Sequence, residues 1–91
     1  MERTKINVEV ICPAVSGRYD FVIDRQMTAG EAAEKIARQI REYEKADVLF
    51  SGGRVLLYSS GSRLPLAPSV PLEKYGVTGG SRLMILQEDG I

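Results

Sequence analysis

Two segments with alternating apolar and polar residues constrain the fold of this chain more than any other feature. Over residues 5–12 every second side chain is apolar, and residues 18–24 repeat the alternation with aromatic and aliphatic residues. A period of two predicts strands that each have one buried face. Pro13 ends the first segment because it cannot donate to a ladder, and Ser16-Gly17 supplies a turn. The sequence therefore predicts an antiparallel hairpin whose apolar face must be covered by another element.

The following segment predicts the helix that covers this face. Thr28 precedes Glu31 by three residues, which is the spacing of a capping box. Apolar residues then recur at steps of three and four and form one stripe: Ala29, Ala32, Ala33, Ile36, Ala37, Ile40 and Tyr43. We expect a helix over about residues 29–44.

The second half of the chain predicts shorter elements separated by glycine and proline turns. Three apolar residues in the connector over 46–53 are expected to pack at the edge of the core, before Gly52-Gly53 breaks the chain: Val48, Leu49 and Phe50. Beyond it we expect a strand at 55–58, a return strand at 63–64, a helical turn at 72–76, a strand at 82–86 and a frayed tail at 87–91. One helix must then cover one sheet, and the first and last strands are expected to lie parallel in the middle of that sheet. This is an α+β architecture.

The segment before the last predicted strand carries a family resemblance. Residues 72–77 read Leu-Glu-Lys-Tyr-Gly-Val and are followed six residues later by Leu83. This spacing resembles ubiquitin-like domains, in which the tyrosine ties its hydroxyl to the loop, so the resemblance implies a structural role for Tyr75. It covers about residues 4–88 and implies a ubiquitin-like β-grasp fold: a mixed four- to five-stranded sheet with one main helix packed across it. Residues 1–91 then form a single ubiquitin-like domain.

A narrower resemblance lies in residues 75–86, Tyr-Gly-Val-Thr-Gly-Gly-Ser-Arg-Leu-Met-Ile-Leu. This segment is similar to the ending of the small bacterial ubiquitin-like proteins linked to type VII secretion, the YukD/EsaB family. Ser81 stands where that family usually has an aspartate. The resemblance implies a non-conjugated, cytoplasmic adaptor or regulatory subunit that binds parts of a secretion machine.

Composition argues against several other classes of function. Twelve basic and twelve acidic residues give no net charge, so the broad positive field that attracts nucleic acid is absent. The sequence has no histidine, and Cys12 is its single cysteine, which removes the usual general base and any two-cysteine metal site. We therefore expect no enzyme, no cofactor and no metal site, and a packing role for Cys12. No apolar stretch has the length of a membrane span, and the first residues do not resemble a signal peptide, so we expect no membrane insertion.

The alternation of side-chain direction along two predicted strands predicts a protein-binding face. In the last strand Leu83 and Ile85 point inward, so their neighbours point away from the helix, and the third strand has the same alternation. The outward apolar residues are Leu56, Tyr58, Met84 and Leu86. Contiguous exposed apolar surface on a small domain often marks a partner site, for another protein or for a second copy. The alternative is that these are scattered surface residues, or that the tail shields them.

Two other functions remain open at this point. Ubiquitin-like modifiers and sulfur carriers end in Gly-Gly, whereas this sequence ends in Asp89-Gly90-Ile91, which argues against that interpretation. The second is a small effector subunit of a multicomponent enzyme, because such subunits also use this fold. Fold alone does not separate these functions from an adaptor.

Overall fold

The computed structural model describes residues 4–47, 49–50, 53–60 and 62–89 of the chain. Its elements follow in this order: β1 (Lys5–Cys12), η1 (Pro13–Val15), β2 (Gly17–Asp24), α1 (Ala29–Glu44), β3 (Gly53–Ser59), η2 (Leu72–Tyr75) and β4 (Arg82–Asp89). The predictions made for Val48, Gly52, Gly90 and Ile91 lie outside the described residues.

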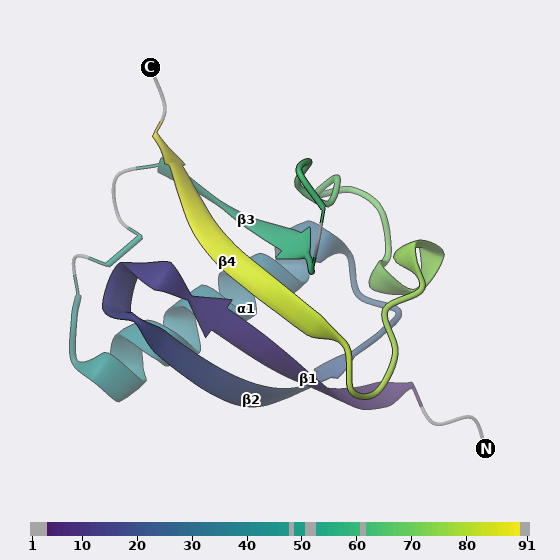
Figure 1. Cartoon of the computed structure of the whole chain (residues 1–91), viewed down its shortest axis with the longest axis horizontal. Coiled ribbons are helices and arrows are strands. Elements are labelled where there is room, and N and C mark those ends of the chain that lie inside the picture. The colour runs from purple at the N-terminus through teal and green to yellow at the C-terminus, as the bar shows by residue number, and fades with distance from the viewer. Residues whose placement is uncertain (1–3, 48, 51–52, 61, 90–91) are drawn as a thin grey trace.

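The strands form one mixed sheet in the order β2-β1-β4-β3. β1 is antiparallel to β2, β4 is antiparallel to β3, and the central strands β1 and β4 run parallel. Figure 1 views the sheet with α1 behind it, so the helix covers one face of the sheet. This arrangement confirms the predicted α+β architecture, in which the first and last strands pair at the centre.

The predicted capping box fixes the start of α1. The Thr28 Oγ1 accepts a hydrogen bond from the Glu31 N–H at 3.1 Å, and the Glu31 Oε1 accepts one from the Thr28 N–H at 3.0 Å. These two bonds occupy donors that a helix start otherwise leaves unpaired. The Thr28 N–H and the Thr28 hydroxyl both donate to the Glu31 Oε1, and these bonds hold the pKa of the Glu31 carboxyl below its ordinary value. The helix ends at Glu44, after which Lys45 adopts the left-handed conformation with φ 53°.

The apolar stripe of α1 packs on the sheet as predicted, except at its last residue. The residues from Ala29 to Ile40 in the stripe are buried, but Tyr43 is 77% exposed. The prediction for Tyr43 was wrong because the last turn of α1 lies beside β2 instead of over the core. There the Tyr43 ring meets the Tyr19 ring edge-on, with the centroids 5.7 Å apart. Cys12 lies fully buried in the core, and burial raises the pKa of its thiol.

Two predictions about the strands were wrong. β4 does not stop at residue 86 but continues to Asp89, because β3 begins at Gly53 and pairs with it along this whole length. Residues 63–64 form no strand, so the sheet has four strands, which lies within the predicted range of four to five. Instead, the Leu66 N–H donates a hydrogen bond to the Leu57 carbonyl at 2.8 Å. The ladder does not continue to residue 64, because the Leu64 N–H and carbonyl both bond to the Ser62 hydroxyl.

Loops close the two ends of the core. The Ala67 N–H donates to the Tyr75 hydroxyl at 2.8 Å, which confirms the structural role that the family resemblance implied for this tyrosine. In the connector, Phe50 is buried and Leu49 packs against the core, as predicted. Of the helices in the described part of the chain, none is both long and apolar enough to cross a membrane.

Candidate protein-binding face

The sheet face that points away from α1 gathers the four predicted site residues. The β3–β4 register places Tyr58 opposite Met84 and Leu56 opposite Leu86. The parallel β1–β4 register adds Ile11 beside Met84. We call these five apolar residues, Ile11, Leu56, Tyr58, Met84 and Leu86, the outer-face patch. The patch extends over three adjacent strands on a face that no described helix covers (Figure 1).

Ile11 is the member of the patch that the sequence prediction missed. It is the one apolar residue on the outward side of β1, which it shares with Lys5, Asn7 and Glu9. A lone apolar residue on a polar strand face was the available signal. This residue can be assigned to the patch only when the β1–β4 register is known, because that register brings Ile11 next to Met84 and makes the patch continuous.

Leu56 differs from the prediction in its exposure. Its side chain points to the outer face, yet it is only 5% exposed, and it does not belong to the cluster of buried residues under α1. Its burial therefore comes from residues on its own face, where Leu86 stands opposite it and Arg54 and Tyr58 flank it along β3. Leu56 forms the floor of the patch, while Ile11, Tyr58, Met84 and Leu86 are half-buried and are open to a partner.

Ion pairs bound the patch at both ends. At one end the Arg82 Nε lies 2.7 Å from the Glu9 Oε1, and at the other the Arg54 Nη2 lies 2.6 Å from the Glu88 Oε1. The hydrogen bond to the Glu88 carboxylate raises the pKa of Arg54 above its ordinary value, so Arg54 keeps its positive charge at physiological pH. An apolar centre with an exposed charged rim is the anatomy of many protein–protein interfaces.

A hollow of ≈ 130 Å³ opens at one edge of the patch. Ile11 and Met84 form its apolar side, and Ser59, Ser60 and Arg82 form its polar side. The volume suits one side chain of a partner and is far below that of a typical small-molecule site. No three His, Cys, Asp or Glu residues of the described segments lie close enough together to hold a metal ion. The apolar side chains of the patch and the charges at its ends can make noncovalent contacts with a protein partner.

Comparisons with known proteins agree on the fold. No protein-family model matches the chain, and no curated protein matches its sequence. The ubiquitin-like domain of the type VII secretion protein EccD1 from Mycobacterium tuberculosis has a TM-score of 0.71 at 20% identity, over 93% of this chain and 100% of that one. A chain of the MycP5-free ESX-5 inner membrane complex has a TM-score of 0.78 at 15% identity, over 98% of this chain but only 22% of that one.

A third solved structure with this fold comes from a different kind of assembly. A chain of the toluene 4-monooxygenase HD complex has a TM-score of 0.78 at 14% identity, over 92% of this chain and 99% of that chain. Together with the single helix packed on a mixed four-stranded sheet, these likenesses show that the protein has the ubiquitin-like β-grasp fold.

Proposed function

We propose that this protein is a non-conjugated ubiquitin-like adaptor or regulatory subunit, and that it binds another protein through the outer-face patch without catalysing a reaction. The observation that carries the proposal is the patch itself. Apolar side chains from β1, β3 and β4 meet on the face opposite α1, and ion pairs frame them at both ends. Tyr58 is the expected anchor, because aromatic residues with a polar tip dominate binding hot spots.

Type VII secretion is the pathway that we propose for the partner. The sequence of residues 75–86 resembles bacterial ubiquitin-like proteins of these systems. Two of the structural neighbours come from such machinery, one as a ubiquitin-like domain of EccD1 and one as a chain of an ESX-5 complex. In this role the protein is a bacterial, cytoplasmic accessory that binds a component of the secretion machine.

A second candidate function is that of a small subunit of a multicomponent enzyme. The observation that favours it is the likeness to a chain of the toluene 4-monooxygenase complex, which matches this chain over almost its full length. Both candidates require a protein partner, and the identity of that partner separates them.

The role of a ubiquitin-like modifier has less support. The Gly79-Gly80 pair forms the turn before β4, where Gly80 has φ +90° and its N–H donates to the Asn7 carbonyl at 2.8 Å. These glycines are thus part of the folded domain.

The experiment that tests the proposal compares three forms of the protein in pull-downs from the native cell, with mass spectrometry of the captured proteins. The forms are wild type, the double variant Tyr58→Ala/Met84→Asp, and the control Leu64→Asp. The control places an acidic residue at an exposed position of the loop after β3. The partner found with wild type is then purified and titrated against each form after circular dichroism has confirmed folding.

We expect the double variant to lose the partner and the control to retain it. A secretion component then supports the first candidate, and an oxygenase component supports the second. Equal binding by the double variant would show that the patch is not the site. Covalent adducts at the carboxyl end of the protein would favour a modifier.

A further inference from the structure

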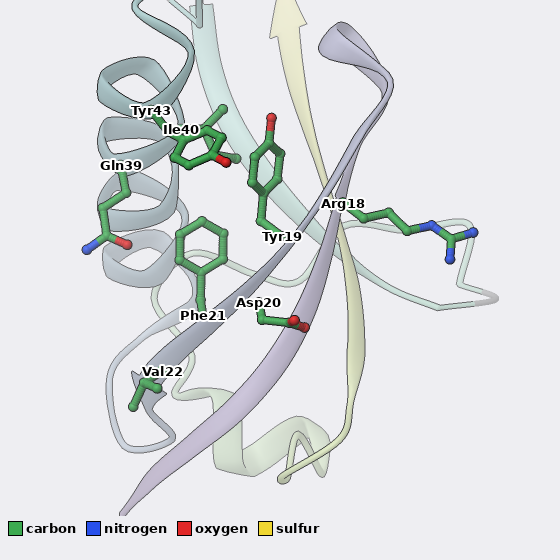
Figure 2. Close-up of a pocket in the computed structure, with 8 residues that line it drawn as sticks. All are labelled: Arg18, Tyr19, Asp20, Phe21, Val22, Gln39, Ile40 and Tyr43. Atoms are coloured by element: carbon green, nitrogen blue, oxygen red, sulfur yellow. The ribbon is translucent and has the colours of Figure 1, made fainter.

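A second hollow lies away from the outer-face patch, between β2 and α1. It has a volume of ≈ 550 Å³. Figure 2 shows Tyr19 and Phe21 of β2 pointing toward the helix, where Ile40 and Tyr43 line the opposite wall, while Arg18 and Asp20 extend to the other side of the strand. The groove exists because α1 lies closer to β3 than to β2 and leaves the inner side of β2 incompletely covered.

β2 is also an open edge of the sheet. Its register with β1 continues to a hydrogen bond of 2.8 Å from the Arg25 N–H to the Thr4 carbonyl. Hydrogen-bonded pairs alternate in an antiparallel ladder, so the odd-numbered residues of β2 bond to β1. The N–H and C=O groups of Arg18, Asp20 and Val22 therefore point outward, and within the described segments no backbone group bonds to them.

The opposite edge of the sheet, strand β3, is partly covered. On β3 the outward-pointing carbonyl of Leu57 already accepts the hydrogen bond from the Leu66 N–H, so the loop after β3 occupies part of that edge. An uncovered edge strand is a template for pairing with another strand. Two exposed apolar residues stand beside the β2 edge and its groove: Val22 is 57% exposed and Tyr43 is 77% exposed.

We propose that β2 pairs with β2 of a second copy of this protein, as antiparallel strands related by a two-fold axis at Phe21. In this register Arg18 stands opposite the partner's Asp24, and the two-fold axis creates this ion pair twice. Asp20 stands opposite the partner's Val22. The outward backbone groups of both strands then bond to one another, and the two four-stranded sheets join into one with both helices on the same face.

The charges on β2 select this register among the symmetric alternatives. An axis at Asp20 places Asp20 opposite its own copy, and an axis at Val22 places Asp20 opposite Asp24, so both bring like charges together. An axis at Tyr19 opposes Arg18 to Asp20 but pairs only residues 17–21. Charged residues usually discourage pairing at an edge strand. On β2 they oppose two registers and favour the one that uses residues 18–24.

This register also brings apolar residues of the two copies together on the helix-facing side, next to the groove. On the helix-facing side, Phe21 stands opposite the partner's Phe21, and Tyr19 stands opposite the partner's Ile23. Apolar cross-strand pairs of this kind stabilise a sheet. The grooves of the two copies become continuous beneath the joined strands, so aromatic surface that is half-exposed in one copy is covered in the pair.

Charge reversal tests both the dimer and its register. The variants are Arg18→Glu and Asp24→Lys, and the matched control is Arg63→Glu, which reverses an exposed arginine away from β2. Asp24 Oδ1 also accepts the Gln26 N–H at 2.9 Å, so thermal melting must confirm the fold of the Asp24 variant. Sedimentation velocity is measured from micromolar to millimolar protein, for each variant alone and for an equimolar mixture of the two.

We expect wild type and Arg63→Glu to dimerise, and each β2 variant to dimerise at least about tenfold more weakly, since two attractive pairs become repulsive. The mixture should recover the affinity, because Arg18→Glu in one copy meets Asp24→Lys in the other while the second pair keeps its native charges. Concentration-dependent protection of the Arg18, Asp20 and Val22 amides from hydrogen exchange reports the edge directly, and it carries the test if Asp24→Lys does not fold.

Three results would each overturn the proposal. Wild type that stays monomeric to millimolar concentration excludes the dimer. A dimer that responds equally to Arg18→Glu and Arg63→Glu lies on another surface. A dimer that is lost in Tyr58→Ala/Met84→Asp but retained in Arg18→Glu forms through the outer-face patch.

Discussion

Replacing Tyr75 by phenylalanine removes one hydroxyl and with it one defined hydrogen bond. The Tyr75 hydroxyl accepts the Ala67 N–H at 2.8 Å, a length typical of a good hydrogen bond. That bond ties the loop before η2 to the last residue of η2. Tyr75→Phe keeps the ring and its packing, so the free energy of unfolding should fall by the net value of one hydrogen bond, about 1 kcal/mol.

The structure sets the expected size of the effect within a range. Tyr75 is 42% exposed, so water compensates part of the lost bond and the fall should not exceed about 1.5 kcal/mol. For a domain of this size, a loss of about 1 kcal/mol lowers the melting temperature by roughly 4–8 °C. Urea unfolding followed by circular dichroism measures the same change as a shift of the midpoint with an unchanged slope.

Tyr43→Phe is the matched control for this experiment. Tyr43 is more exposed than Tyr75, and its hydroxyl makes no hydrogen bond to any described residue. Its removal should leave the melting temperature nearly unchanged. If both variants melt at the same temperature, the hydroxyl of Tyr75 does not hold the loop, and the structural role that the family resemblance implied for it is refuted.

Two further predictions concern α1 and its neighbour β2. Thr28→Ala removes the hydroxyl of the capping box and should lower the free energy of unfolding by about 1 kcal/mol in urea titrations, whereas Thr28→Ser should retain most of it; equal losses would show that the hydroxyl is not the cap. The hydrogen bond to Glu44 raises the pKa of Tyr19 from 10.0 to about 12. The folded-state pKa of Tyr19 lies above its unfolded value. The stabilisation of the folded state by this hydrogen bond is therefore complete below pH 10 and is lost as pH rises toward about 12. Ultraviolet titration should show one late-titrating tyrosine that Glu44→Gln returns toward its ordinary pKa; an unchanged late titration would contradict the assignment.

The two proposed surfaces are compatible with each other. The outer-face patch lies over β1, β4 and β3, whereas the proposed dimer uses the free edge of β2 at the other side of the sheet. In that dimer both patches remain free and face the same way. A partner with two binding sites could then be held through two contacts at once, which increases the apparent affinity without any new contact in either patch.

The candidate site shows how much of a binding face the alternation of side chains along a strand can predict. The alternation of β3 and β4 is a local property of the sequence, and it was enough to place Leu56, Tyr58, Met84 and Leu86 on one face. It did not place Ile11 beside them, because this neighbour lies on another strand and depends on the parallel register of β1 and β4. Nor did it predict the burial of Leu56, since exposure depends on the side chains around a residue and not only on the direction in which it points.

The same limit explains the errors in the elements. The polar residues Gln87 and Glu88 are typical of a tail, but they continue β4 because β3 offers paired backbone groups and because Arg54 meets Glu88 at 2.6 Å. Tyr43 fits the helical period, yet it lies outside the core because the sheet beneath α1 ends at β2. In each case the deciding contact joins residues far apart in the chain.

By itself, the sequence determined the hairpin, the capped helix, the core faces and the ubiquitin-like order of elements. These features follow from periods of two and 3.6 residues and from turn and cap chemistry, which act between near neighbours. Only the tertiary structure decided the continuity of the outer-face patch, the length of β4 and the open edge of β2 above its groove. Strand register and the position of α1 over the sheet set all three, and both result from packing the whole domain at once.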